Sequence, residues 1–263
     1  MSGYVDDVVI PYDRELGPVL FEHYGKAIAQ RVAASEPRDV LEVAAGTGIA
    51  TRHLRSLIPQ DAKLTAIDIS DSMMEIARAK FSPEEQVTFQ IADATMLPFD
   101  DGSFDAVVCQ FGVMFFDREP AFREVYRSLR RGGRYLFSVW DSAQYNPFAS
   151  LSFDVLKQFF PMDTPRFLFE PVAAHPIDPI KEQLIRTGFD SLVISVQRHV
   201  HEIHDVSAFA RALIYSPVLF EIQNRGGNPE EIAELLAETI RKEFGETPAR
   251  YPMQAIVYET EKG

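Results

Sequence analysis

The chain has 263 residues, 46% hydrophobic and 25% charged, which are proportions typical of a folded globular protein rather than a disordered one. Its length fits one α/β domain with insertions. The 26 basic and 39 acidic side chains give a formal net charge of -13, which argues against nucleic acids and anionic lipids as partners and favours a small-molecule ligand.

The first half of the chain alternates between predicted strands and helices. Asp39–Ala44 is a short β-branched, apolar run that meets glycines at once, as a buried parallel strand does. Helices are predicted from Thr47 to Ile58, from Ser72 to about Phe81, with Ser72 and Glu75 as a capping box, and from Arg118 to Leu129. The other strands are predicted at Lys63–Ile69, Gln86–Ala92, Phe104–Gln110 and Gly133–Trp140. Such alternation predicts right-handed βαβ units and a mostly parallel sheet with helices on both faces.

After Trp140 the pattern changes. Residues 142–179 combine phenylalanines with prolines, which predicts a short helix and an irregular covering segment. Further elements are predicted as a helix at Ile177–Thr187, a strand at Ser191–Val200, helices at Asp205–Tyr215 and Glu230–Phe244, and a last strand at Tyr251–Tyr258. We therefore expect a single domain over residues 1–263. Its cofactor-binding half would be 1–140, and 141–263 would hold acceptor-covering insertions and the last strands of a seven-stranded sheet.

The loop Glu42-Val43-Ala44-Ala45-Gly46-Thr47-Gly48 joins the first strand to the first helix. A glycine-rich turn there lets backbone amides and a helix N-terminus approach a ligand closely. Nicotinamide dinucleotides use a similar turn, but their fingerprint has a third glycine where this chain has Thr51. The bulk of Thr51 disfavours a dinucleotide. A sulfonium ligand that carries an amino-acid ammonium suits the carboxylate of Glu42 better.

The segment Val40–Gly48 resembles motif I of class I S-adenosylmethionine-dependent methyltransferases, particularly the ubiquinone and menaquinone biosynthesis type. Ala44 stands where many members have their first glycine. Three later segments resemble the family in the same order, namely Ala66–Met73, Ala92–Asp105 and Gln110–Phe116. The resemblance covers about the first half of the chain. It implies the Rossmann-like class I methyltransferase fold, with helical insertions after strand five and between the last two strands, and S-adenosyl-L-methionine as cofactor.

The resemblance also implies roles for individual residues. Asp68 would accept both ribose hydroxyls, Ile69 and Met73 would pack against the adenine, and Asp93 with the Ala94 amide would meet the adenine edge. Gln110 and Phe111 would border the methionine portion and the transferred methyl group. Because an N-terminal segment folds across the cofactor in related enzymes, Tyr12 could cover the methionine end. The implied cofactor-binding residues are Tyr12, Glu42, Ala44, Gly46, Thr47, Gly48, Asp68, Ile69, Met73, Asp93, Ala94, Gln110 and Phe111.

Methyl transfer from a sulfonium is an in-line displacement, so a catalytic side chain is optional. His23, Asp141 and Tyr145 are weak candidates for a general base, and a solvated or core role is favoured for each. The insertions predict a hydrophobic or aromatic small-molecule acceptor, because they would overhang the carboxyl edge of the sheet. Two alternatives stay open, which are a non-catalytic cofactor-binding regulatory or scaffold protein and a nicotinamide oxidoreductase.

The remaining sequence features argue against a metal site, a disulfide and a membrane segment. His199, His201 and His204 cluster near the end of a predicted strand, but no carboxylate pattern of a known zinc motif accompanies them, so we predict no metal site. The single cysteine, Cys109, is expected to be a buried thiol, and it excludes an intrachain disulfide. No signal peptide or membrane-spanning stretch is recognisable, so we expect a cytoplasmic location without membrane insertion.

Overall fold

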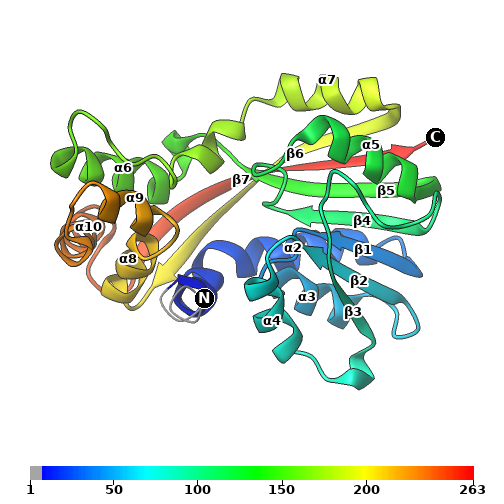
Figure 1. Ribbon diagram of the computed structural model, residues 1–263, viewed down its shortest axis with the longest axis horizontal. Coiled ribbons are helices and arrows are strands. Elements are labelled where there is room, and N and C mark those ends of the chain that lie inside the picture. The colour runs from blue at the N-terminus through cyan, green and yellow to red at the C-terminus, as the bar shows by residue number, and fades with distance from the viewer. Residues whose placement is uncertain (1–7) are drawn as a thin grey trace. The chain divides into compact units, whose positions relative to one another are not determined.

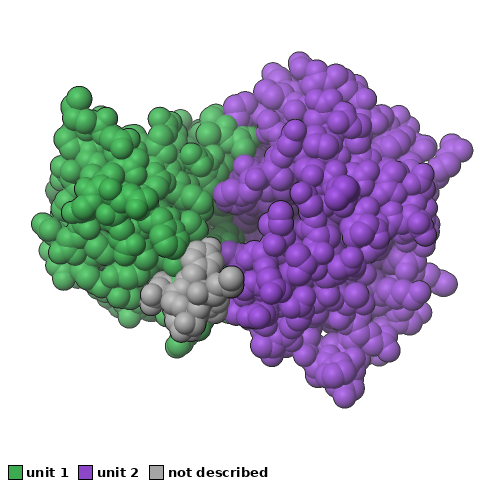
Figure 2. All heavy atoms as spheres, viewed as in Figure 1, with its two compact units in different colours: residues 1–21, 140–175, 197–255 green, residues 22–139, 176–196, 256–263 purple. Residues whose placement is uncertain are grey.

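The structure is a computed structural model that describes residues 8–263. The chain divides into two compact units, coloured separately in Figure 2. Unit 1 is formed by Met1–Phe21, of which residues 8–21 are described, with Trp140–His175 and Gln197–Ala255. Unit 2 is formed by Glu22–Val139, Pro176–Val196 and Ile256–Gly263.

A seven-stranded sheet organises unit 2, with strand order β3-β2-β1-β4-β5-β7-β6. Its strands are β1 (Asp39–Val43), β2 (Lys63–Asp68), β3 (Val87–Ile91), β4 (Phe104–Gln110), β5 (Leu129–Trp140), β6 (Phe189–Ile203) and β7 (Ala249–Lys262). Strands β1 to β5 pair in parallel, whereas β7 runs against β5 and β6 (Figure 1). The predicted α/β architecture with a mostly parallel sheet is confirmed.

Helices cover both faces of this sheet because successive strand residues point to opposite sides. On one face, Val40 and Val108 pack with α2 (Glu22–Ala33) and α3 (Ile49–Leu57). On the other, Leu41 and Val107 pack with α5 (Arg118–Ser128) and α7 (Ile177–Thr187). The helix α4 (Asp71–Ala79) and the short η3 (Pro83–Glu85) lie between β2 and β3 in the chain. The parallel strands therefore end together at one carboxyl edge.

Unit 1 is mainly helical, and η2 (Tyr12–Phe21) belongs to it. Beyond β5 it contains η4 (Ala143–Tyr145), α6 (Pro147–Phe159) and η5 (Glu170–Ala174). Between β6 and β7 it contains α8 (Val206–Ile214), α9 (Val218–Asn224) and α10 (Pro229–Phe244). Helix α10 packs against α8 and α6, and η2 packs against α8. Both helical insertions thus lie where the sequence predicted them.

Several predicted boundaries were wrong. The predicted capping box of Ser72 and Glu75 does not form, because the N-cap of α4 is Ser70, whose extended backbone lets its hydroxyl accept the Met73 amide. Strand β5 begins four residues before Gly133, at Leu129, with an irregularity in its pairing to β4 that absorbs the Gly-Gly turn. Strands β6 and β7 extend beyond their predicted ends, and α9 was not predicted.

Candidate cofactor-binding site

The glycine loop after β1 is shaped by its second glycine. Gly48 has φ of +82° and is the N-cap of α3. A Cβ atom there would lie 3.1 Å from the Cβ of Ala77, so α4 packs directly against the loop. A side chain would therefore be strained and crowded at this position. The loop delivers the N-terminus of α3 to the carboxyl edge, where a ligand can approach the backbone.

Asp68, the last residue of β2, holds this loop in place. Its Oδ2 accepts a hydrogen bond from the Gly46 amide at 2.8 Å, and its Oδ1 accepts one from the Ser70 amide at 2.8 Å. The residue is 9% exposed. Because a carboxylate offers about four acceptor positions, two remain for hydroxyl groups of a ligand. The geometry therefore suits the predicted contact with ribose hydroxyls.

Glu42, near the end of β1, is a buried acid without a full set of partners. It is 1% exposed, and its Oε2 has no hydrogen-bond partner. Its pKa is raised to about 8, mainly by burial, with the nearby Thr51 hydroxyl opposing the shift and the charge of Asp68 adding to it. The hydroxyl oxygen of Thr47 is also buried without a partner. Such atoms are costly unless a ligand satisfies them. An ammonium group would satisfy the carboxylate of Glu42.

The segment after β3 is arranged around Asp93. Its Oδ1 accepts the Thr95 amide at 2.8 Å and the Thr95 hydroxyl at 2.7 Å, and these bonds lower its pKa. Asp93 is therefore ionised at neutral pH, with Oδ2 available for an exocyclic amine. Ile69 and Met96 leave 71% and 75% of their surfaces exposed on this edge, so apolar surface is available for an adenine ring. Met96 is an addition to the predicted set.

The carboxyl end of β4 is strained. Phe111 has φ of +56°, which is rare for a bulky side chain, and its amide bonds to the Ser138 carbonyl at 3.1 Å. Its ring packs edge-on against Tyr24 of α2, with centroids 5.6 Å apart. The Oε1 of Gln110 lies 3.1 Å from the position of a Cβ on Gly25. Helix α2 therefore contributes to this corner, which no motif in the sequence indicated.

Ala44, which departs from the family pattern, is accommodated because Gly112 packs beside it. Its φ is +56°, a conformation that favours glycine. Its Cβ lies 2.4 Å from the position that a Cβ on Gly112 would occupy, and the Sγ of Cys109 lies 2.7 Å from that position. The methyl group of Ala44 thus fits because residue 112 has no side chain. This contact also joins the glycine loop to the turn after β4.

For the other predicted residues, the contacts in the structure do not indicate a particular role. The sulfur of Met73 lies 3.8 Å from the position of a Cβ on Gly46, beside the glycine loop. His23 lies on α2 with its ring edge-on to Tyr24. Tyr12 lies in unit 1, with its ring 5.2 Å from that of Phe21. The roles of Met73, His23 and Tyr12 stay predictions.

Asp141 and Tyr145 lie in unit 1, just beyond β5. Oδ2 of Asp141 accepts from Nε2 of Gln254 at 2.5 Å, and its Oδ1 accepts from the Ser142 amide at 2.6 Å. The Tyr145 ring is 41% exposed and lies 5.9 Å from the guanidinium carbon of Arg198. Because both oxygens of Asp141 are already bonded, the contacts favour a structural role for this residue.

Two other features carry no cofactor chemistry. His199 and His201 have ring centroids 5.8 Å apart, and burial lowers the pKa of both. Among residues 8–263, no three side chains of the usual metal-binding types gather as ligands.

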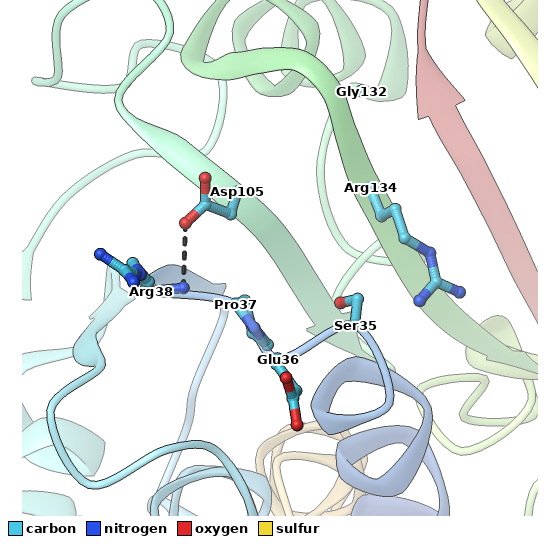
Figure 3. Close-up of a pocket in the computed structure, with 7 residues that line it drawn as sticks. All are labelled: Ser35, Glu36, Pro37, Arg38, Asp105, Gly132 and Arg134. Atoms are coloured by element: carbon cyan, nitrogen blue, oxygen red, sulfur yellow. Dashed lines mark hydrogen bonds between the residues drawn. The ribbon is translucent and has the colours of Figure 1, made fainter.

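A cavity of about 320 Å³ lies at the amino ends of β1 and β4 (Figure 3), opposite the glycine loop. Two of its lining charges are already paired, Asp105 with Arg130 at 2.7 Å and Arg134 with Glu259 at 2.7 Å.

The residues at the carboxyl edge fit S-adenosylmethionine in the order in which its parts occur. The orphaned oxygen of Glu42 matches the ammonium, Asp68 matches the ribose, and Asp93 with Ile69 matches the adenine. The described residues contain no helix long and apolar enough to cross a membrane.

Comparison with known proteins identifies the kind of domain that residues 41–137 resemble. Residues 41–137 match the model of a family described as "Methyltransferase domain". The ubiquinone/menaquinone biosynthesis C-methyltransferase UbiE of Pasteurella multocida is 30% identical over 167 residues, covering 58% of this chain and 62% of that protein. The Escherichia coli UbiE is 31% identical over 167 residues, covering 58% of this chain and 66% of that protein. The match thus spans slightly less than two thirds of these relatives' length.

Solved structures share the fold. A phosphoethanolamine N-methyltransferase 2 of Haemonchus contortus, in complex with S-adenosylhomocysteine, has a TM-score of 0.63 at 17% identity, covering 99% of this chain and 59% of that one. A Thermotoga maritima protein described as a SAM-dependent methyltransferase has a TM-score of 0.57 at 19% identity, with 100% coverage of both chains. The sheet order is also that of class I methyltransferases. Residues 41–137 therefore match a methyltransferase domain, within a chain that has the fold of these solved methyltransferase structures.

Proposed function

We propose that this protein is an S-adenosylmethionine-dependent methyltransferase that transfers a methyl group to a small hydrophobic or aromatic acceptor. The observation that carries the proposal is the buried, unpartnered Oε2 of Glu42 beside the loop that Asp68 holds. A cationic partner stabilises the ionised form of a buried acid and satisfies its orphaned oxygen, and the ammonium of the cofactor is such a partner. A location in the cytoplasm is part of the same proposal.

The chain's own residues would bind, orient and exclude water. Glu42 would hold the ammonium, Asp68 the ribose and Asp93 the exocyclic amine of adenine. S-adenosylmethionine, when bound, supplies an electrophilic methyl group on a sulfonium. An in-line displacement then needs the nucleophile aligned with that methyl in a water-poor site. The strained end of β4 at Phe111 is suited to fixing this alignment, because backbone strain often accompanies a defined functional geometry.

The nature of the acceptor is supported by three observations. The UbiE relatives are named for C-methylation in ubiquinone and menaquinone biosynthesis, and quinones are apolar ring compounds. The carboxyl edge of unit 2 exposes apolar side chains, Ile69, Met96 and Phe115 among them. The net charge of -13 disfavours polyanionic acceptors.

Two measurements test the proposal. Calorimetry should show binding of S-adenosylmethionine and S-adenosylhomocysteine and none of NADH. The variant Asp68→Ala should lose this binding at least tenfold, whereas the exposed Asp61→Ala should not change it. Formation of S-adenosylhomocysteine with a panel of phenolic and quinol acceptors then tests turnover. Binding of NADH alone would refute the proposal, and cofactor binding without turnover of any acceptor would support a regulatory or scaffold role.

A further inference from the structure

An exposed phenyl ring stands at the turn that follows β4. Phe115 is 62% exposed, although its neighbours in sequence are not. Its amide donates a hydrogen bond to the Gly112 carbonyl at 3.0 Å, which closes the turn and directs the side chain outward. A single exposed phenylalanine needs no explanation on an ordinary surface. Here the structure of the surrounding turn suggests a function for the exposed ring.

The turn that presents Phe115 is anchored on both sides. Val113 is 1% exposed within the core, and Met114 and Phe116 pack against that core. Before them, Phe111 holds its strained conformation against Tyr24, and Gly112 has no room for a side chain. Packing on both sides of Phe115 therefore fixes the conformation of this segment. Strained, well-anchored segments that present one side chain are typical of functional sites.

The turn also lies beside the reacting end of the proposed cofactor site. Gly112 contacts Ala44 of the glycine loop, where Glu42 would hold the amino-acid portion. The other strongly exposed apolar side chains of this edge, Ile69 and Met96, follow β2 and β3, on the adenine side. Because β4 is separated from β2 by β1, Phe115 belongs to the methyl-donating side of the edge.

We propose that Phe115 is a specificity-determining residue that packs its ring against an apolar, planar acceptor. The inference rests on the proposed methyltransferase function. A phenyl ring offers apolar area and a preference for stacked or edge-to-face aromatic partners, and it carries no group that would recognise a charged acceptor. The acceptor class is therefore an aromatic or quinol ring rather than an amino acid or a phosphate ester.

The test measures binding of 1,4-dihydroxynaphthalene to the protein saturated with S-adenosylhomocysteine. Phe115→Ala should weaken this binding at least tenfold and leave the dissociation constant of S-adenosylhomocysteine within twofold. Phe115→Tyr keeps the ring and should restore binding. The matched control is Ile185→Ala, which removes an apolar side chain of similar exposure, 56%, from α7. Thermal midpoints verify that each variant is folded.

The outcomes separate this inference from the proposed function. If the wild-type protein binds S-adenosylhomocysteine but not dihydroxynaphthalene, or if Phe115→Ala binds dihydroxynaphthalene as the wild type does, the role of Phe115 is refuted and the proposed cofactor site stands. If the wild-type protein fails to bind S-adenosylhomocysteine, the proposed function fails first. A loss of dihydroxynaphthalene binding in Ile185→Ala equal to that in Phe115→Ala would also overturn the inference.

Discussion

At the scale of single residues, Glu42 links the cofactor site to protein stability. Its pKa is raised to about 8 in the folded protein by burial, whereas an exposed glutamate titrates near 4.3. Between these values the folded state holds a proton that the unfolded state has released. The stabilising contribution is therefore complete below about pH 4, declines as pH rises, and is lost above about pH 8.

We predict that Glu42→Gln removes this pH dependence. From pH 5 to pH 8.5, the unfolding free energy of the variant should rise relative to that of the wild type by on the order of 3 kcal/mol. Urea unfolding at several pH values measures it. Glu75→Gln, on the exposed surface of α4, should give a curve parallel to that of the wild type. Parallel curves for Glu42→Gln as well would show that Glu42 is not buried as described.

The same residue predicts proton release when the cofactor binds. At pH 7 most of Glu42 is protonated, because its pKa is about 8. Pairing with an ammonium requires the carboxylate, so binding of S-adenosylhomocysteine should release about one proton. Calorimetry in phosphate and in Tris measures the number from the dependence of heat on buffer ionisation. Glu42→Gln should bind more weakly and release close to none. An equal release in the variant would assign the proton to another group.

Replacing Ala44 with glycine is predicted to stabilise the protein. Its φ of +56° costs an alanine about 1 kcal/mol relative to glycine, and part of that is offset by the greater freedom of glycine in the unfolded chain. Ala44→Gly should therefore raise the unfolding free energy by about 0.5 kcal/mol or more, as denaturant titration would show. Ala45→Gly, whose backbone lacks a positive φ and whose side chain is 8% exposed, should lower it. A loss of stability in both variants would contradict the strain at Ala44.

At the scale of elements, Asn146 ties the start of α6 to β7. It is fully buried, and its Nδ2 donates to the carbonyls of Asp141, Ser142 and Gln254 at 2.9, 3.2 and 3.0 Å. Its Oδ1 accepts the Gln254 amide at 3.1 Å. The side chain thereby fixes where the first insertion leaves the sheet.

Removing this side chain should destabilise unit 1. Asn146→Ala leaves several buried backbone groups unsatisfied, so the unfolding free energy should fall by about 3 kcal/mol. Asn224→Ala, at the exposed end of α9, should change it by less than about 0.5 kcal/mol. Circular dichroism during urea unfolding measures both values. A change in Asn146→Ala as small as in Asn224→Ala would show that solvent reaches these carbonyls.

The elements also show how far the sequence could predict the fold and the site. Strands such as Phe104–Gln110 were predictable because buried parallel strands are rich in apolar residues, whereas the cap of α4 depends on which of two nearby serines the backbone holds extended. Asp68 and Asp93 were predictable because they follow strands within motifs. Gly25 lies outside every motif. Met96 and Phe115 lie within segments that resemble the family but received no role there, and only packing and exposure in the folded chain reveal them.

At the scale of the whole molecule, the proposed cofactor site is formed by segments far apart in sequence. The parallel strands β1, β2, β3 and β4 all end at one edge, so the residues that follow them meet there. These segments comprise residues 42–48, 68–73, 93–96 and 110–115, and all lie in unit 2. A ligand that binds them should restrain all four together.

We therefore predict a specific pattern of hydrogen exchange. Saturation with S-adenosylhomocysteine should slow amide exchange in all four segments, because binding to the native state suppresses local opening wherever the ligand makes contact. Residues 35–38, which line the cavity at the opposite edge, serve as an internal control and should exchange unchanged. In Asp68→Ala the protection should disappear from all four segments at once, since that carboxylate holds the glycine loop to the end of β2. Protection confined to a single segment, or centred on residues 35–38, would place the cofactor elsewhere than at the carboxyl edge.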